Sequence, residues 1–242
     1  MESSEVVQHS REGGRVLVIM AKAPRPGAVK TRLAQNLSVE AVTELYRCLL
    51  DDTLALTHSL EGVEVVIMCP ASDVEEMARL AGDATTVVAQ EGAGLAAALA
   101  SVFARFAAPR GDRVIAFNSD SPHLPASVLT GAFEMLIAHD VIVGPTYDGG
   151  YYLVGAKAAH ATLFHGDGMG TNSALDDLLE RARRLQLSVG FTEAFYDIDV
   201  EGDLTQLAAE LRLAPARAPR TAAWLKEWQP ATLPLRTGAG EP

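Results

Sequence analysis

The sequence predicts an α/β protein with three layers, in which a mainly parallel, mixed sheet lies between two layers of helices. Two observations predict this class. Short apolar runs alternate along the chain with longer segments of helical periodicity, and most of these runs are continuous, as in strands that helices cover on both faces. The alternation also favours crossover connections, which join parallel strands.

We expect strands at 16–20, 63–68, 85–88, 114–117, 141–143 and 151–154, and helices near 39–58, 73–81, 94–106, 126–138 and 171–185. The chain has 242 residues, a length that suits one domain. We place this domain at 15–229, between an N-terminal tail at 1–14 and a C-terminal tail at 230–242. Trp224 and Trp228 have helical apolar spacing and would pack on the core or on a partner, which leaves a homodimer open.

The charge of the chain limits the partners that we expect. The formal net charge is −11 and the isoelectric point is near 5.0, which argues against a general nucleic-acid or membrane-surface binder because phosphate surfaces select basic proteins. No apolar run approaches the roughly 20 residues of a spanning helix, and the start lacks the apolar centre of a signal peptide. Cys48 and Cys69 are too few for a disulfide framework. We expect a cytoplasmic protein.

A basic, turn-rich loop follows the first predicted strand and reads AKAPRPGAVKTRL. Its prolines fix the backbone, while Gly27 allows a tight turn. The loop holds four cations, which could converge on one anion: Lys22, Arg25, Lys30 and Arg32. The spacing of a Walker A loop is missing, and a solvated basic loop is the alternative.

An acidic residue, Asp120, lies just past the fourth predicted strand in the segment NSDSPHLP. Open α/β sheets bind ligands beyond the carboxyl ends of their strands. A carboxylate there suits Mg²⁺, which prefers one or two carboxylates, with phosphate oxygens and water completing its shell. The alternative is that Asp120 caps the following helix. His123 in the same loop receives no role.

Two glycine-rich segments are further candidates. Gly149 and Gly150 follow Asp148, and they favour either a plain hairpin turn or backbone N–H groups that are open to a ligand. Thr171 and Asn172 follow other glycines just before a predicted helix. That position suits an anion or a hydroxyl-rich ligand, and an ordinary helix cap is the alternative.

Near the end of the predicted domain, the segment FYDIDVEGDL contains a run of acids: Asp197, Asp199, Glu201 and Asp203. A charge run of this kind is usually a solvated face. Asp199, however, follows a short apolar segment and could meet Asp120 across the site.

Five segments, in this order, resemble the glycosyltransferase-like proteins of the DUF2064 type: AKAPRPGAVKTRL, NSDSPHLP, GPTYDGGYYLVG, GTNSALDDLLERARRL and YDIDVEGDL. More distantly, they resemble phospholactate and molybdenum-cofactor guanylyltransferases. The similarity covers about residues 15–212 of the chain. Its first and third segments are the most specific.

The resemblance implies the GT-A, or nucleotide-diphospho-sugar transferase, fold. It implies that Asp120 and Asp199 hold a divalent metal, Mg²⁺ or Mn²⁺. It also implies that the first loop wraps the nucleotide phosphates through Lys22, Lys30 and Arg32, and QEGAGLAAAL is similar to the segment that faces the base and acceptor side in the guanylyltransferases. We assign the nucleotide to Ala21, Lys22, Gly27, Lys30, Arg32, Gln90 and Gly94. We assign the acceptor to Asp148, Gly149, Gly150, Thr171 and Asn172.

The sequence departs from the family pattern at several points. It reads QEGAGLAAA where many DUF2064-type sequences read QGEGDLGER, so an acid and an arginine are missing. Its GDGMGTNSAL leans toward the form of the phospholactate enzymes, and both departures weaken a sugar-transfer assignment. The motif around Asp120 lacks the second aspartate of a glycosyltransferase D-x-D.

Three functions remain compatible with these residues. The first is nucleotidyl transfer: a small phosphorylated or other oxyanion acceptor attacks the α-phosphorus of an NTP and pyrophosphate leaves. In it, Lys30 and Arg32 stabilise the β,γ-phosphates, and Asp120 is catalytic through its metal. The second is glycosyl transfer from a nucleotide sugar, and the third is a nucleotide-binding scaffold without turnover. Four cations suit a triphosphate better than a diphosphate, which favours the first.

Overall fold

The computed structural model describes residues 13–110, 112–160, 162–165 and 173–228. The strands are β1 (Arg15–Met20), β2 (Glu64–Cys69), β3 (Thr86–Ala89), β4 (Arg113–Asn118), β5 (Val141–Pro145), β6 (Tyr151–Ala156) and β7 (Val189–Phe191). The helices are α1 (Val39–His58), α2 (Val74–Ala81), α3 (Gly94–Arg110), α4 (Ala126–Ala138), α5 (Ala174–Arg184), α6 (Glu201–Leu213) and α7 (Pro219–Glu227). Short 3-10 turns lie at Leu33–Gln35, Ala71–Asp73 and Pro215–Arg217.

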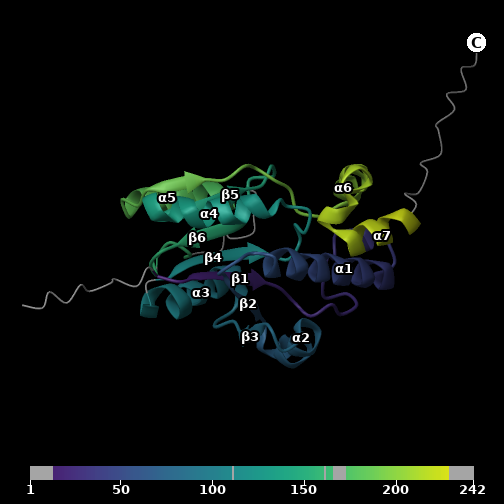
Figure 1. Cartoon of the computed structure of the whole chain (residues 1–242), viewed down its shortest axis with the longest axis horizontal. Helices are drawn as coiled ribbons and strands as arrows, with labels where there is room; N and C mark the ends of the chain where they lie inside the picture. Colours follow the sequence, from purple (N-terminus) through teal and green to yellow (C-terminus); the bar gives the residue numbers. More distant parts are fainter. Residues whose placement is uncertain (1–12, 111, 161, 166–172, 229–242) are drawn as a thin grey trace, which may run out of the picture.

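The strands form one sheet in the order β3-β2-β1-β4-β6-β5-β7 (Figure 1). Strands β1 to β4 pair in parallel, and β5 pairs in parallel with β7. Only β6 runs antiparallel to its two neighbours, β4 and β5, within the described chain. The predicted class, an α/β protein with a mainly parallel, mixed sheet, is therefore confirmed.

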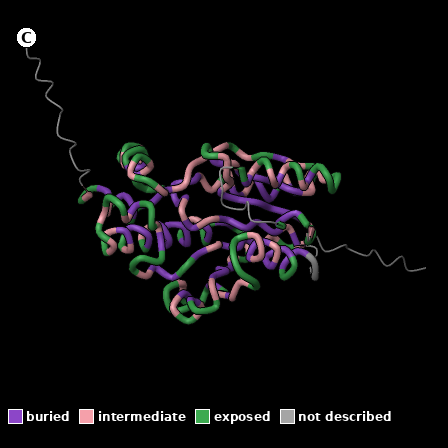
Figure 2. Tube along the Cα trace, turned by 180° about the vertical axis from the view of Figure 1, so that it is seen from behind, coloured by how far each residue is buried: buried purple, intermediate pink, exposed green. Residues whose placement is uncertain are grey.

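Alternating side chains of the sheet enter two apolar layers. On β1, Val16 and Val18 pack in the layer that contains α3 and α5, whereas Leu17 and Ile19 pack in the layer that contains α1, α2 and α4. This period of two, with both faces covered, explains why the strands are continuous apolar runs in the sequence. Figure 2 shows the buried residues along the sheet and the inner faces of the helices. Each large apolar side chain buried in this way contributes about 1.5–3 kcal/mol.

A third apolar cluster joins α1 to the C-terminal helices α6 and α7, which lie together beside α1 (Figure 1). Helix α1 buries Leu45 and Leu49 against these helices and Leu50 against the sheet. Trp224 and Trp228 stack with their ring centroids 6.4 Å apart and pack against the same cluster. This packing agrees with the core interpretation of their spacing.

Every predicted strand is present, and the structure adds β7. That strand is three residues long, too short to show a period in the sequence. Helix α6 follows the acid run directly, and its first turn holds Glu201 and Asp203. The predicted limits of the domain stay a prediction, because 1–12 and 229–242 lie outside the described residues. No helix of the described chain is both long enough and apolar enough to cross a membrane.

Asp52 connects α1 to the N-terminus of α7. Its side chain is buried, and its carboxylate accepts the backbone N–H of Arg220 at 3.2 Å and that of Thr221 at 2.7 Å. The first N–H groups of a helix have no partner within it, and an anion there is also favoured by the helix dipole. Asp52 of α1 thus accepts hydrogen bonds from the free N–H groups at the start of α7 and caps that helix.

We expect Asp52→Ala to lower the free energy of unfolding by about 1–3 kcal/mol, because two N–H groups at the start of α7, one of them buried, lose their acceptor. Asp51→Ala is the matched control: Asp51 lies beside Asp52, and its carboxylate lies 3.6 Å from the exposed Arg220 side chain. Its loss should cost less than about 1 kcal/mol. Urea unfolding measures both, and equal costs would contradict the capping role.

Candidate functional site

Loops that are distant in sequence meet at the carboxyl edge of the sheet. The parallel strands β1, β4 and β5 end there, whereas the antiparallel β6 begins there. The segment after β7 returns to the same edge, where Thr146 and Phe195 form an isolated parallel bridge. The first loop, the Asp120 loop, the β5–β6 hairpin and the acid run are therefore neighbours.

The first loop is held open by its link to the start of α2. Gly27 has φ +75°, a conformation that favours glycine. The buried carboxylate of Asp73 accepts the N–H of Ala23 at 2.9 Å and lies 2.8 Å from Arg25 Nη1, while Arg25 Nε lies 2.7 Å from Glu76. Burial alone would raise the pKa of Asp73, but its hydrogen bonds and Arg25 lower it.

The expectation that Arg25 converges with the other three cations is corrected by these contacts. Its guanidinium is directed to Asp73 and Glu76 and does not line the pocket described below. Because the segment around α2 supplies the acids, the sequence of the loop alone could not indicate this. Arg25 fixes the loop, and the remaining cations face the site.

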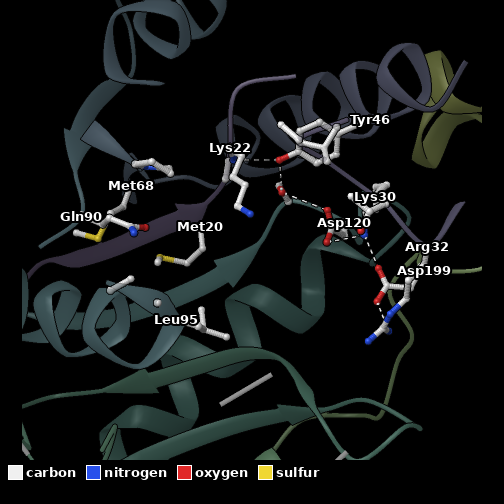
Figure 3. A pocket seen from close by; sticks show the side chains of 18 residues that line it. Met20, Lys22, Lys30, Arg32, Tyr46, Met68, Gln90, Leu95, Asp120 and Asp199 are labelled. Carbon is white, nitrogen blue, oxygen red and sulfur yellow. Dashed lines mark hydrogen bonds and ion pairs between the residues drawn. The ribbon is translucent and has the colours of Figure 1, made fainter. Parts of the chain in front are cut away.

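Lys30 links the two aspartates that the sequence pairs. Its Nζ lies 2.7 Å from Asp120 Oδ2 and 2.9 Å from Asp199 Oδ1, and Arg32 Nη1 lies 3.1 Å from Asp199 Oδ2 (Figure 3). The Lys30 side chain is 5% exposed, whereas that of Arg32 is 63% exposed. Asp120 and Asp199 thus converge as predicted, with a lysine ammonium between them.

The charges of this cluster stabilise one another. Burial alone would lower the pKa of Lys30, but the carboxylates of Asp120 and Asp199 raise it above its usual value. Burial alone would raise the pKa of Asp199, but Lys30 and Arg32 lower it. Lys30 and Asp199 are therefore both charged at neutral pH, as a desolvated ion pair must be.

Asp120 is positioned by a hydrogen-bond chain from α1 that we did not predict. The Tyr46 hydroxyl and Ser119 Oγ are 3.0 Å apart, and Ser119 Oγ donates to Asp120 Oδ1 at 3.2 Å. The same hydroxyl accepts the backbone N–H of Lys22 at 3.2 Å. Burial first, and then Asp120, raise the pKa of Tyr46 to about 12. A tyrosine inside an apolar helical pattern carries no local signal of such a role.

Asp199 is positioned by its own segment. Ile198 is buried in the third cluster, so the alternation of extended chain turns Asp197 and Asp199 to the opposite side, toward the site. Asp203 accepts the N–H groups of Asp199 and Val200, both at 2.8 Å, and so fixes the start of α6. The solvated-face interpretation therefore does not describe Asp197 and Asp199.

Asp197 is a site residue that we did not predict from the sequence. It lines the smaller pocket described below. Burial raises its pKa to about 6, and the nearby carboxylates of Asp120, Asp199 and Asp148 act in the same direction, against Lys30. The D-I-D alternation around buried Ile198 was the available signal, and it points both aspartates to one side.

The larger pocket has a volume of about 720 Å³ and lies between the first loop, β1 and the start of α3 (Figure 3). Most residues that we assigned to the nucleotide line it: Ala21, Lys22, Lys30, Arg32, Gln90 and Gly94. Gly27 does not line it and instead forms the turn of the loop. Met20, Met68 and Leu95 add apolar surface.

A smaller pocket of about 300 Å³ adjoins the larger one. The two share Asp120, Asp199 and Arg32, so the ion-pair cluster lies at their junction. Asp148 and Gly150 line the smaller pocket. The carboxylate of Asp148 accepts from Thr146 Oγ1 at 2.5 Å and from the N–H of Gly150 at 3.2 Å.

Of the other acceptor residues, Gly149 has φ +88° and its N–H donates to Thr146 O. The hairpin interpretation therefore describes Gly149, which does not line the smaller pocket. Thr171 and Asn172 lie outside the described residues, so their assignment stays a prediction.

The donor set suits a hard divalent cation. Asp120 and Asp199 supply carboxylate oxygens, and a lysine ammonium already lies between them. Within the described residues, no group of three or more histidine, cysteine, aspartate or glutamate side chains could hold a metal on its own. Mg²⁺ is commonly bound by one or two carboxylates together with substrate phosphates, so these residues fit such an ion.

Comparison with known proteins agrees with this fold. Residues 53–171 match the family DUF2064, described as "Uncharacterized protein conserved in bacteria". The resemblance to DUF2064 is confirmed. The matched segment contains Asp120 and Asp148, whereas the first loop and Asp199 lie outside it. None of the curated proteins matches the sequence.

Among solved structures, one from Desulfovibrio desulfuricans G20, provisionally assigned as a nucleotide-diphospho-sugar transferase, is 28% identical. The alignment has a TM-score of 0.82 and covers 89% of this chain and 95% of that one. A 4-diphosphocytidyl-2C-methyl-D-erythritol synthase from Anaerococcus prevotii is 11% identical, with a TM-score of 0.56 over 83% and 97% of the two chains. Rv0371c from Mycobacterium tuberculosis is 20% identical, with a TM-score of 0.51 over 81% and 98%. The last two show the fold alone.

His123, which received no role, is buried and packs against Phe195 and Tyr196. Its ring lies 4.7 Å from that of Tyr196, and neither ring nitrogen has a hydrogen-bond partner among the described residues. Burial lowers its pKa to about 4. Below pH ~6.5 the unfolded chain binds a proton at this residue that the folded protein takes up only near pH 4, so stability falls as the pH falls through this window.

We therefore expect His123→Phe to remove part of the acid sensitivity. At pH 7 the two proteins should have similar stability, and at pH 4.5 the variant should be more stable than the wild type by about 1–3 kcal/mol. Urea unfolding across this pH range measures the difference. Parallel curves for the two proteins would show that His123 is not a buried neutral group.

Proposed function

We propose that the protein is a metal-dependent nucleotidyltransferase, which moves an NMP from an NTP to a small acceptor and releases pyrophosphate. The observation that carries the proposal is the position of Asp120, Asp199, Lys30 and Arg32 at the junction of two pockets. The larger pocket holds the nucleotide and the smaller pocket the acceptor. The α-phosphorus then lies near the junction, where the acceptor can approach it.

Each side chain has a role in this proposal. Lys30 and Arg32 stabilise charge on the β- and γ-phosphates of the leaving pyrophosphate. Asp120 and Asp199 hold Mg²⁺ or Mn²⁺, which supplies Lewis-acid polarisation of the phosphate oxygens when it is bound. Tyr46 and Ser119 fix the orientation of Asp120. No covalent nucleophile is needed, because positioning and charge stabilisation can supply most of the rate.

The lining of the smaller pocket bears on the acceptor. Four carboxylates line it, from Asp120, Asp148, Asp197 and Asp199, and Arg32 is the only cation among its lining residues that the structure describes. The sequence favoured a phosphorylated or other oxyanion acceptor. Because carboxylates repel an anion, a phosphate of the acceptor would have to lie beside Arg32 and the metal. Near Asp148, the carboxylate favours hydroxyl groups of the acceptor, which can donate to it. A cytoplasmic location stays a prediction.

The second candidate is glycosyl transfer from a nucleotide sugar. It is favoured by the provisional assignment of the Desulfovibrio protein, which is 28% identical to this chain. On this alternative, the same cluster holds the diphosphate of the leaving group. The first candidate is preferred because Lys30, Arg32 and Lys22 all line the nucleotide pocket, and this charge suits a triphosphate better.

We expect Asp120→Asn to lower kcat/KM for nucleotidyl transfer by about a thousandfold or more, because it removes a carboxylate that holds the metal. Asp83→Asn, at an exposed position outside both pockets, should retain wild-type activity. Circular dichroism checks that both variants are folded. Activity of Asp120→Asn near the wild-type level would refute the metal role.

The products distinguish the two candidates and the scaffold alternative. A panel of NTPs and nucleotide sugars is first screened with Mg²⁺ by thermal shift, since a ligand that binds the folded state raises its apparent stability. The best stabilisers are then incubated with candidate acceptors. We expect pyrophosphate from an NTP; a nucleoside diphosphate from a nucleotide sugar would instead indicate glycosyl transfer. Tight binding of an NTP without metal dependence and without any product would indicate a scaffold.

A further inference from the structure

The ammonium of Lys30 occupies the position that the proposed metal needs. It lies within 2.9 Å of carboxylate oxygens from both Asp120 and Asp199, and its side chain is almost completely buried. A divalent cation bound by the same two carboxylates would be separated from this ammonium by only a few ångströms. Two positive charges at such a distance repel strongly in a partly desolvated site. Lys30 and the metal therefore exclude each other here.

We infer that Lys30 is a displaceable counter-ion, which neutralises Asp120 and Asp199 in the free protein and transfers to the polyphosphate when nucleotide and metal bind together. This inference rests on the proposed function and adds that the metal binds well only when the nucleotide is bound. The free protein binds metal weakly, because the metal must first expel the ammonium. The nucleotide removes this cost, because its phosphates give the ammonium a new anionic partner.

The surroundings of Lys30 allow this transfer. The lysine has a flexible four-carbon stem, and it lines the larger pocket, in which the polyphosphate is placed. The side chains of Asp120 and Asp199 are 23% and 37% exposed and line both pockets, so an ion can reach them once the ammonium leaves. Arg32 contacts only Asp199 of the two and is largely exposed, so it leaves Asp120 free for a metal.

Metal and nucleotide must then bind cooperatively. If the nucleotide raises the affinity for the metal by some factor, the metal raises the affinity for the nucleotide by the same factor. Loss of the Lys30 ammonium would separate the two effects, because it opens the carboxylates to metal while it removes a phosphate contact. A variant with tighter metal binding and weaker polyphosphate binding is the expected signature.

The test compares Lys30→Met with wild type by isothermal titration of the full chain with Mn²⁺ alone. We expect Mn²⁺ to bind the variant at least about tenfold more tightly than the wild type. Inorganic tripolyphosphate, titrated without metal, should bind it at least about tenfold more weakly. Lys22→Met is the matched control: Lys22 is exposed and lines the same pocket, and its hydrogen bond to Tyr46 is made by its backbone N–H. Its Mn²⁺ affinity should stay within about twofold of wild type.

A measurement on the wild type covers the case in which Lys30→Met does not fold. The ¹⁵Nζ resonance of Lys30, assigned by its loss in Lys30→Arg, should persist in 1 mM Mg²⁺ and shift when tripolyphosphate is added with Mg²⁺. A shift with Mg²⁺ alone, or equal Mn²⁺ affinity of wild type and Lys30→Met, would overturn the inference. If Mn²⁺ binds the wild type and Lys30→Met equally, and Asp120→Asn abolishes this binding, then the inference about Lys30 fails but the proposed metal site is retained. If Mn²⁺ binds no variant, with or without tripolyphosphate, the proposed function fails as well.

Discussion

The site depends on the buried ion pair that joins Lys30 to Asp120 and Asp199. Each partner comes from a different loop, and each would be unfavourable in its position without the others, because an unpaired charge is costly to desolvate. The ion pair thus couples the order of the first loop to that of the segment after β7. The chain Tyr46–Ser119–Asp120 extends this coupling to α1, and Asp203 extends it to α6. These charges therefore connect five parts of the chain: the first loop, the Asp120 loop, the segment after β7, α1 and α6.

Much of the fold follows from local sequence. Continuous apolar runs predicted the covered strands, and helical periods predicted five helices, because burial on both faces of a sheet requires those patterns. The antiparallel placement of β6 between β4 and β5 was not predicted, since strand order depends on contacts between distant segments. Strand β7 was missed because three residues show no period. Helix α6 was not predicted, because the acids of its first turn, Glu201 and Asp203, resemble a solvated charge run.

The site was predictable where residue type and strand end coincide. Asp120 and three cations of the first loop have that signal, and the structure places them around one pocket: Lys22, Lys30 and Arg32. Arg25 has the same signal but pairs with Asp73 and Glu76 instead of lining the pocket. The sequence of the loop does not indicate these partners, because they belong to the segment around α2. Asp197 and Tyr46 have almost no local signal. They reach the site only through contacts between distant segments of the folded chain, and the pattern of a single sequence does not reveal those contacts.

The reversed direction of β6 separates the linings of the two pockets. It makes β5 and β6 a hairpin with a short tip, which brings Asp148 to the carboxyl edge of the sheet. The larger pocket, to which we propose that the nucleotide binds, is lined by other segments. A change in the hairpin would therefore alter the lining of the smaller pocket and leave that of the larger pocket unchanged.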